Sequence, residues 1–294
     1  MTEMSANIPK VSALVTSAWL KQQIQSAAQN FKSASKSLRI LDSSWVSSSE
    51  VDCCKEFYQQ GHIPTAIFFD LRTVCPAQHN AHIKYPIPDS NFFKEYVQGL
   101  GISNDTHIIV YDRLNTYRPS FRIWFLFRLF GHNQVSVLDG GLKQWIKDGN
   151  DVTTETSEVE PGVFNAQFQP HLIRDHMSMV KNIDTGVEQV IDARKAQTYL
   201  DGHIPGSKNI AYPSIFNEDG TFRTPSELRQ LFVQAGVDLD SPIVASCGGG
   251  MTACILIAAA HVLGKEDVPL HNGSFREWSA LTTPNMISHS EFQG

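Results

Sequence analysis

Cysteine is scarce in this chain, and its residues follow no regular spacing. The 294 residues contain 5 cysteines, an odd number: Cys53, Cys54, Cys75, Cys247 and Cys254. Small secreted domains held by disulfides carry an even, regularly spaced set, so we expect free thiols and a reducing compartment. The sequence has no cysteine separated by two residues from another cysteine or from a following histidine (CxxC or CxxH), so neither a zinc site nor any other metal is predicted.

Excess positive charge and long apolar runs are also missing. The net charge is −6, which gives a nucleic-acid-binding role no electrostatic support. The longest apolar stretches, near residues 123–130 and 253–263, are shorter than the roughly 18 residues of a membrane span. We therefore expect neither nucleic acid nor a membrane among the partners.

The N-terminal sequence lacks the basic segment followed by an apolar run that marks a secretory signal. Residues 10–40 carry several basic residues and no acid, a composition with a faint likeness to a transit peptide. The competing interpretation is a helix over residues 17–30 that belongs to the fold. The sequence predicts a cytoplasmic protein, with the mitochondrion as the alternative compartment.

Short apolar segments alternate with amphipathic ones along the chain. Apolar runs rich in β-branched residues predict buried strands, and periodic apolar spacing ended by glycine predicts helices. In the first half, strands are expected at residues 39–42, 66–70, 107–111 and 135–138, and helices at residues 51–60, 91–100, 120–130 and 142–147. Such alternation is typical of an α/β fold in which helices cover a parallel sheet in three layers.

The same series of elements returns in the second half. Gly61-His-Ile-Pro64 recurs as Gly202-His-Ile-Pro205, and Asp139-Gly-Gly-Leu-Lys-Gln-Trp145 is matched by Asn272-Gly-Ser-Phe-Arg-Glu-Trp278. The matched strands and helices between these motifs keep the same order. This pattern is a tandem duplication of one domain.

The duplication sets the predicted domain organisation. The N-terminal domain is expected over residues 11–149 and the C-terminal domain over residues 163–294. The polar stretch at residues 150–162 is the expected linker, and a strand at residues 163–168 is expected to wrap from one half to the other.

The stretch from Ile243 to Cys254 carries the strongest chemical signal. A buried strand ends at Ser246, Cys247 follows it, and three glycines lead toward an apolar helix. Unpaired backbone N–H groups in such a loop favour negative charge, and a stabilised thiolate is a nucleophile near neutral pH. Ligands of parallel sheets bind at the carboxyl ends of strands, so Cys247 is the predicted nucleophile. Cys254 lies inside the helix and is predicted to be a core residue.

The duplication also supplies an internal comparison. In the first half, Asp112 takes the position of Cys247, and no glycines follow it. We therefore predict that the first half keeps the architecture and is non-catalytic. The Gly-His-Ile-Pro turns occur in both halves, so His62 and His203 are expected to be structural rather than catalytic.

Together these motifs resemble the rhodanese family in its two-domain form, which comprises thiosulfate and 3-mercaptopyruvate sulfurtransferases. The resemblance spans residues 11–281 and is carried by the paired turns, Leu138-Asp-Gly-Gly141, Gly206-Ser-Lys-Asn209 and Cys247-Gly-x-Gly-x-Thr-Ala253. It implies two tandem α/β domains and transfer of a sulfane sulfur through a persulfide on the cysteine of the second domain. The implied partners are a small sulfur donor and a thiol or cyanide acceptor, with a thioredoxin-like reductant as a further candidate. No cofactor is implied.

A persulfide anion needs several hydrogen-bond donors around its outer sulfur. The backbone N–H groups of the loop are the candidates: Gly248, Gly249, Gly250, Met251 and Thr252.

Three residues outside the loop are candidates for supporting roles. Asp70 resembles an aspartate proposed to assist the cysteine in mercaptopyruvate-type relatives, and the alternative is a strand-end cap. Trp45 resembles an aromatic residue that lines the pocket in the family, and the alternative is core packing. Arg194 follows Asp192 and resembles one partner of the family's structural ion pair, and the alternative is contact with the substrate.

The sequence departs from the family where the donor is bound. The resemblance implies which residues are expected at the positions of Gly248 and Gly249. Thiosulfate-preferring members have Arg followed by Lys there, and mercaptopyruvate-preferring members have Gly followed by Ser. The arginine-containing insertion of the mercaptopyruvate group is missing, and the nearest family arginine falls on Thr198. The residue that anchors an anionic donor is therefore open, with four candidates: Arg113, Arg118, Arg122 and Lys208.

Two other functions are compatible with a reactive cysteine on this fold. One is a degenerate, non-enzymatic sulfur carrier or interaction module, which the missing serine and arginines suggest. The other is a cysteine-dependent phosphatase, which needs an arginine at the end of a longer loop to bind phosphate. The residue six positions after Cys247 is Ala253, and the next arginine is Arg276, so phosphatase activity is not expected.

Overall fold

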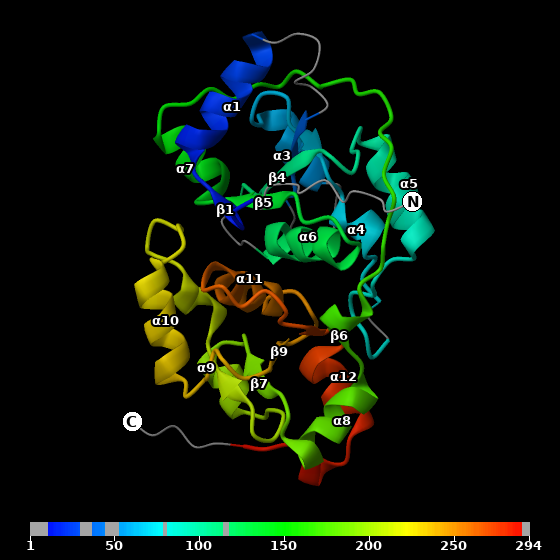
Figure 1. The fold of residues 1–294 in the computed structure, drawn as a ribbon, viewed down its shortest axis with the longest axis vertical. Coiled ribbons are helices and arrows are strands. Elements are labelled where there is room, and N and C mark those ends of the chain that lie inside the picture. The colour runs from blue at the N-terminus through cyan, green and yellow to red at the C-terminus, as the bar shows by residue number, and fades with distance from the viewer. Residues whose placement is uncertain (1–10, 30–36, 45–52, 79–80, 114–117, 290–294) are drawn as a thin grey trace, which may run out of the picture.

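The computed structural model describes residues 11–29, 37–44, 53–78, 81–113 and 118–289. Two α/β domains are stacked along the long axis of the molecule (Figure 1). Each contains a five-stranded sheet in which all neighbouring strands are parallel. The predicted three-layer architecture is confirmed.

The N-terminal sheet has the strand order β1-β5-β4-β2-β3. Its strands are β1 (Leu14–Val15), β2 (Leu38–Asp42), β3 (Ile67–Phe68), β4 (His107–Tyr111) and β5 (Val135–Leu138). Its helices are α1 (Ser17–Gln29), α3 (Cys53–Gln60), α4 (Leu71–Val74), α5 (Ser90–Gly99), α6 (Arg118–Leu129) and α7 (Gly141–Lys147). Strands β4 and β5 are buried along almost their whole length, as the apolar β-branched run over residues 107–111 predicts for β4.

The C-terminal sheet repeats this arrangement as β6-β10-β9-β7-β8. Its strands are β6 (Ile173–Arg174), β7 (Gln189–Asp192), β8 (Lys208–Asn209), β9 (Ile243–Ser246) and β10 (Leu270–His271). Its helices are α8 (His176–Thr185), α9 (Ala196–Leu200), α10 (Pro225–Gln234), α11 (Ala253–Val262) and α12 (Ser274–Leu281), with short 3₁₀ turns η1 (Pro170–Leu172), η2 (Tyr212–Ile215) and η3 (Pro284–Met286). The matching strand orders place β9 where β4 lies in the first domain.

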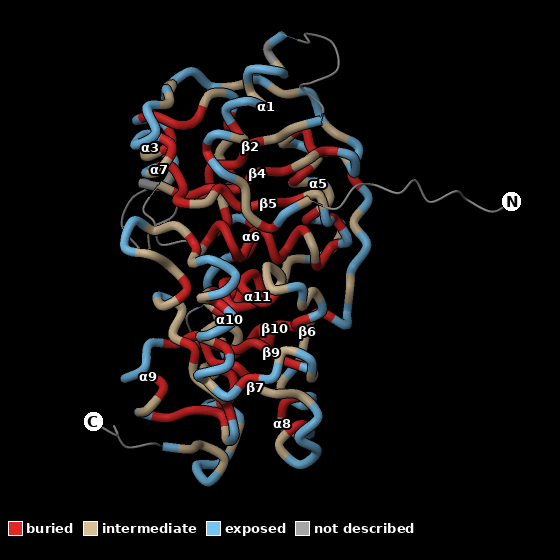
Figure 2. The backbone as a smooth tube through the Cα atoms, turned by 60° about the vertical axis from the view of Figure 1, so that its left-hand side comes forward, coloured by how far each residue is buried: buried red, intermediate tan, exposed pale blue. Residues whose placement is uncertain are grey.

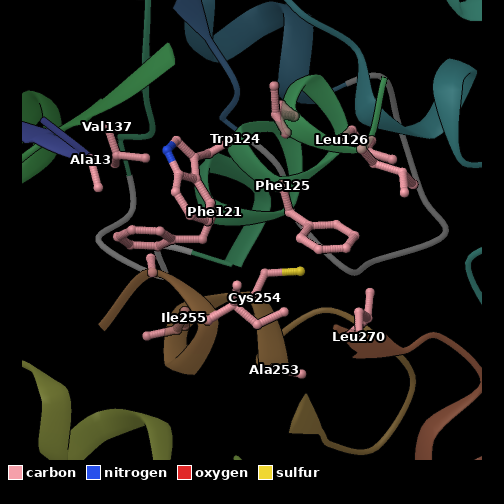
Figure 3. Packing of buried hydrophobic residues seen from close by; sticks show 14 of the residues in the cluster. Ala13, Phe121, Trp124, Phe125, Leu126, Val137, Ala253, Cys254, Ile255 and Leu270 are labelled. Carbon is pink, nitrogen blue, oxygen red and sulfur yellow. The ribbon is translucent and has the colours of Figure 1, made fainter. Parts of the chain in front are cut away.

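The two domains are held together by helices α6 and α11, which face each other at the centre of the molecule (Figure 1). Figure 2 shows that both helices are as buried as the strands. Side chains of Phe121, Trp124 and Phe125 from α6 pack close to Cys254 and Ile255 of α11 (Figure 3). Helix α11 is apolar all round because this interface covers the face that would otherwise meet water.

The strand predicted at residues 163–168 is absent, because this segment has no regular secondary structure. It runs along the first domain, where Gln167 donates its backbone N–H to the Phe130 carbonyl at 2.9 Å. Phe164 is 1 % exposed and packs against Phe93 and Phe127 in the core of that domain. An anchored phenylalanine, rather than pairing with a strand, therefore fixes this segment.

The two Gly-His-Ile-Pro turns are built in the same way. His62 Nδ1 lies 2.8 Å from the Tyr58 carbonyl and its ring stacks on Tyr58, while His203 Nδ1 lies 3.0 Å from the Tyr199 carbonyl and stacks on Tyr199. Both rings are buried. The same contacts in the domain with and without the thiol identify these histidines as structural.

Candidate active site

Cys247 follows β9 directly and lies at the carboxyl edge of the second sheet, between the ends of β7 and β10. The cysteine is 1 % exposed and sits beneath its own loop. The loop needs the residues from Gly248 to Thr252 before α11 begins at Ala253. The thiol is thus enclosed by backbone rather than placed on the first turn of the helix.

Gly250 closes this loop over the sulfur. Its backbone N–H donates to Cys247 Sγ at 3.2 Å. Its φ of +83° lies in the left-handed region that favours glycine, and a Cβ here would lie 2.5 Å from the Asn272 carbonyl oxygen. Gly250 is therefore the loop position at which glycine is required.

Ser274 supports the same geometry from the start of α12. Its hydroxyl accepts the backbone N–H groups of Cys247 at 3.0 Å and Gly250 at 3.1 Å, and it lies 3.7 Å from Cys247 Sγ. It also donates to the His271 carbonyl at 2.8 Å. Ser274 has a φ of +54°, so the structure holds a side chain in a strained conformation beside the thiol.

The sequence analysis missed Ser274, although the repeat contains a signal for it. The matching position in the first domain is Gly141, which has a φ of +56°. The turn keeps its left-handed conformation in both domains, and only the domain with the cysteine places a hydroxyl there. A serine where the duplicate has a strained glycine is the pattern that would have identified it.

The domain without the thiol contributes directly to the loop through Arg122 of α6. This fully buried guanidinium donates to the Gly250 carbonyl at 3.0 Å and to the Tyr85 carbonyl at 3.1 Å. Asn272 donates to the same Tyr85 carbonyl at 3.2 Å. The site is therefore assembled from both domains.

Cys247 opens onto a cavity of about 530 Å³. The loop residues Gly248, Gly249, Met251 and Thr252 line it, and so the predicted loop positions are brought together, with Gly250 beneath them. The remaining lining residues come from both domains: Lys84, Tyr85, Arg194, Lys195, Thr198, Tyr212 and Arg276. A cavity with basic residues around a thiol is suited to a small anion.

Arg194 lines the cavity, but its guanidinium is bound within the protein. It forms a buried ion pair with Asp192 at 2.8 Å and donates to the carbonyls of Thr198 and Gly202. The face of the guanidinium lies 4.0 Å from the centre of the Phe275 ring. These contacts fit the structural ion pair that the resemblance implies.

Asp70 is not among the described residues that line the cavity. Asp70 caps α4 by accepting the Arg72 backbone N–H and forms an ion pair with the Arg72 side chain at 3.0 Å. Trp45 lies outside the described residues. Asp112 follows β4 as Cys247 follows β9, and it is buried with Ser120 3.4 Å away.

The basic residues considered from the sequence as donor anchors do not line the cavity where their side chains are described. Arg113 donates to the Gly61 carbonyl, and Arg122 lies beneath the loop. Lys208 donates to Gln189 and to the Gly236 carbonyl. The side chain of Arg118 is outside the described part. Sequence reasoning missed Lys84 and Arg276, because only the fold brings residues 81–85 and α12 to the cysteine.

Cys254 behaves as the predicted core residue. Its side chain is fully buried between α6 and α11, with Sγ 3.6 Å from the Gly250 carbonyl. Burial raises the pKa of the Cys254 thiol to about 12, and burial also raises the pKa of Cys75. Both groups therefore remain protonated near neutral pH. The side chains of Cys53 and Cys54 lie outside the described residues.

In the described residues, no cluster of three or more His, Cys, Asp or Glu side chains has the arrangement of a metal site. Within the same ranges, no helix has both the length and the apolar content to cross a bilayer.

Cys247 at the carboxyl edge of one of two duplicated parallel sheets defines a tandem α/β protein with a cysteine site in its second domain. The model of the rhodanese-like domain matches residues 16–148 and 177–281. The chain belongs to the rhodanese family of sulfurtransferases, as its motifs predict.

Known proteins resemble the chain over nearly its whole length. It is 39% identical to thiosulfate sulfurtransferase of Cricetulus griseus, covering 92% of this chain and 93% of that protein. It is 34% identical to 3-mercaptopyruvate sulfurtransferase of Mus musculus, with 94% of both chains covered. The crystal structure of the 3-mercaptopyruvate sulfurtransferase SseA from Escherichia coli superimposes with a TM-score of 0.78 at 30% identity, covering 90% of this chain and 99% of that one.

Proposed function

We propose that the protein moves a sulfane sulfur from thiosulfate or 3-mercaptopyruvate to cyanide or a thiol through a persulfide on Cys247. The observation that carries this proposal is the position of Cys247 Sγ. It accepts the Gly250 N–H at 3.2 Å, and the residue lines a cavity surrounded by basic side chains. A thiolate is the reacting form of a cysteine, and both features favour negative charge on sulfur.

The first half-reaction loads the enzyme. The Cys247 thiolate attacks the outer sulfur of thiosulfate and forms a new S–S bond. The S–S bond of thiosulfate breaks, and its electron pair leaves on sulfite. With 3-mercaptopyruvate, the C–S bond breaks instead, and the carbon takes a proton to give pyruvate. The negative charge of the thiolate passes to the outer sulfur of the persulfide.

The second half-reaction removes the sulfur from the loaded enzyme. Cyanide or a thiolate attacks the outer sulfur, the persulfide S–S bond breaks, and the Cys247 thiolate is restored as thiocyanate or a new persulfide departs. The backbone N–H groups from Gly248 to Thr252 are proposed to stabilise the outer sulfur, because oriented backbone donors around an anion act as a preformed binding site. No cofactor takes part in either half-reaction.

Turnover with a panel of donors tests this function. Thiocyanate formation from thiosulfate and cyanide, and pyruvate formation from 3-mercaptopyruvate, are expected for the wild type and not for Cys247→Ser. Product formation that persists in Cys247→Ser, or the lack of product with every donor, would contradict the proposal.

A second candidate is a sulfur carrier or interaction module that does not turn over small donors. Gly248 and Gly249 favour it, since they place no side chain in the cavity, and so does the uncharged Thr198, on which the nearest arginine implied by the family resemblance falls. Such a carrier would accept sulfur at Cys247 only from a persulfide on another protein. Efficient turnover of a small donor would exclude it.

A cytoplasmic location and a thioredoxin-like reductant as acceptor belong to the same proposal. The described cysteines Cys75, Cys247 and Cys254 are free thiols, which suits a reducing compartment. Localisation of the full chain in cells distinguishes the cytoplasm from the mitochondrion. Persulfide discharge by reduced thioredoxin, followed by mass spectrometry, tests the partner.

A further inference from the structure

The cysteine loop has no side chain at Gly249, and Lys84 of the other domain lies beside this position in the cavity. Gly249 has no side chain, and a Cβ at this position would lie 3.5 Å from Lys84 Cβ and 3.9 Å from Lys84 Cδ. Both residues line the cavity onto which Cys247 opens. The side chain of Lys84 therefore lies against the loop where a longer residue at position 249 would extend.

The segment that carries Lys84 is held in place by side chains of both domains. Arg276 Nε donates to the Ala81 carbonyl at 3.0 Å. Arg122 and Asn272 both donate to the Tyr85 carbonyl, at 3.1 Å and 3.2 Å. Three side chains thus hold the backbone on either side of Lys84. This fixed backbone reduces the conformational entropy that the lysine would lose on binding a ligand.

The charge of the cavity gives the class of ligand. No Asp or Glu is found among the described residues that line it. The Arg194 guanidinium is already paired with Asp192, whereas Lys195 is exposed. Lys84 is half-buried, with its ammonium 5.2 Å from the centre of the Tyr85 ring. A partly desolvated ammonium near the thiol is suited to an oxyanion.

We propose that Lys84 binds the anionic end of the sulfur donor, the sulfonate of thiosulfate or the carboxylate of 3-mercaptopyruvate. This inference rests on the proposed function and adds a substrate-binding role for the domain that lacks the thiol. The donor lies with its outer sulfur toward Cys247 and its charged end toward Lys84. The second domain has no basic residue at positions 198 and 249. Lys84 of the first domain supplies the positive charge instead.

The test is the rate at which Cys247 gains one sulfur atom in a single turnover, measured by intact mass over a range of thiosulfate concentrations. We expect Lys84→Met to lower the apparent second-order loading rate by about tenfold to a hundredfold, as for the loss of a charge-assisted hydrogen bond. Discharge of the loaded enzyme to 2-mercaptoethanol, an uncharged acceptor, should be unchanged. Lys84→Arg should retain most of the loading rate, and Lys143→Met, which removes an exposed lysine of α7, should retain all of it.

A second variant separates binding from folding. Adding Gly249→Lys to Lys84→Met returns an ammonium to the cavity from the loop itself, and loading should recover. Loading by Lys84→Met at the wild-type rate would overturn the role of Lys84, and the same holds if Gly249→Lys fails to rescue it. Either result leaves the proposed function standing, provided that the wild type turns over. Absence of loading in the wild type would instead reject the function.

Discussion

Arg122 and Gly250 are joined by a hydrogen bond of 3.0 Å between the guanidinium of one domain and the cysteine loop of the other. The Gly250 carbonyl accepts this bond while its N–H points at Cys247 Sγ. Arg122 therefore holds the carbonyl of the residue whose own N–H donates to the sulfur, without touching the sulfur in the described contacts. The domain that has Asp112 in place of the cysteine thus supports the cysteine loop of the other domain.

Arg122→Met tests this support. The variant leaves the Gly250 carbonyl without the guanidinium, and an orphaned buried acceptor costs about 1–3 kcal/mol. We expect a lower midpoint in urea denaturation together with slower sulfur loading. Arg128→Met is the matched control, because Arg128 also lies on α6 and bonds across the domains, to His261 and the Glu266 carbonyl, away from the cysteine. It should lose stability and keep its loading rate. Equal loading by both variants would contradict the role of Arg122.

Ser274 is expected to position the thiol through its hydroxyl. Ser274→Ala removes the acceptor of two backbone N–H groups and should slow loading about tenfold or more. Ser274→Gly removes the same hydroxyl but relieves the left-handed strain, worth about 1 kcal/mol. We predict that both variants load slowly and that the glycine variant unfolds at the higher temperature. Normal loading by the glycine variant would show that strain, rather than the hydroxyl, limits the alanine variant.

Two neighbouring glycines should respond differently to alanine. At Gly250 the added Cβ would lie 2.5 Å from a backbone oxygen in a left-handed residue, so Gly250→Ala should cost about 1–3 kcal/mol and abolish loading. At Gly249 the Cβ would make ordinary contact with Lys84, and Gly249→Ala should change stability by less than about 0.5 kcal/mol. Thermal unfolding of the two variants compares them. Equal destabilisation would mean that the loop differs from the structure described.

Much of this site could be predicted from the chain because it is local or repeated. Cys247 and its glycines are consecutive, and a short apolar run rich in β-branched residues precedes them, so the sequence predicted a thiol at the carboxyl end of a parallel strand. The duplication added the comparison with Asp112, which separates architecture from chemistry. The parallel direction of the strands followed from the alternation of strands and helices, whereas the order of the strands in each sheet did not.

The rest depended on contacts between distant segments. Lys84 follows a polar loop and Arg276 lies in a helix nearly two hundred residues later, yet a hydrogen bond to Ala81 joins these segments. Arg122 carries a charge in an apolar helix, and nothing in its neighbours says which carbonyls it meets. Phe164 suggested a strand by its spacing, but the apolar pocket that anchors it belongs to the first domain.

The stability of the protein should fall on acidification through His107. Burial lowers the pKa of His107 to about 4, with the nearby His132 as a lesser cause. An unfolded histidine titrates near about 6.5, so between these values the unfolded state binds a proton that the folded state refuses. The contribution of His107 to the free energy of unfolding is therefore complete above the pKa of the unfolded histidine, about 6.5, and is lost as the pH falls toward the folded pKa of about 4. Urea denaturation of the wild type and His107→Gln at several pH values measures this slope.

The free energy of unfolding should fall less steeply with decreasing pH in His107→Gln than in the wild type. A substitution of the exposed His82, His82→Gln, serves as the control and should keep the wild-type slope. Identical slopes in the wild type and His107→Gln would contradict the assignment.

The most direct test of the central claim is the intact mass of three proteins after incubation with thiosulfate and removal of excess donor. The wild type and Cys254→Ala are expected to gain one sulfur atom, because Cys254 is buried and protonated, while Cys247→Ser gains none. Cyanide should then remove the added mass and release thiocyanate. A sulfur atom retained on Cys247→Ser, or lost with Cys254→Ala, would place the persulfide elsewhere and contradict the account.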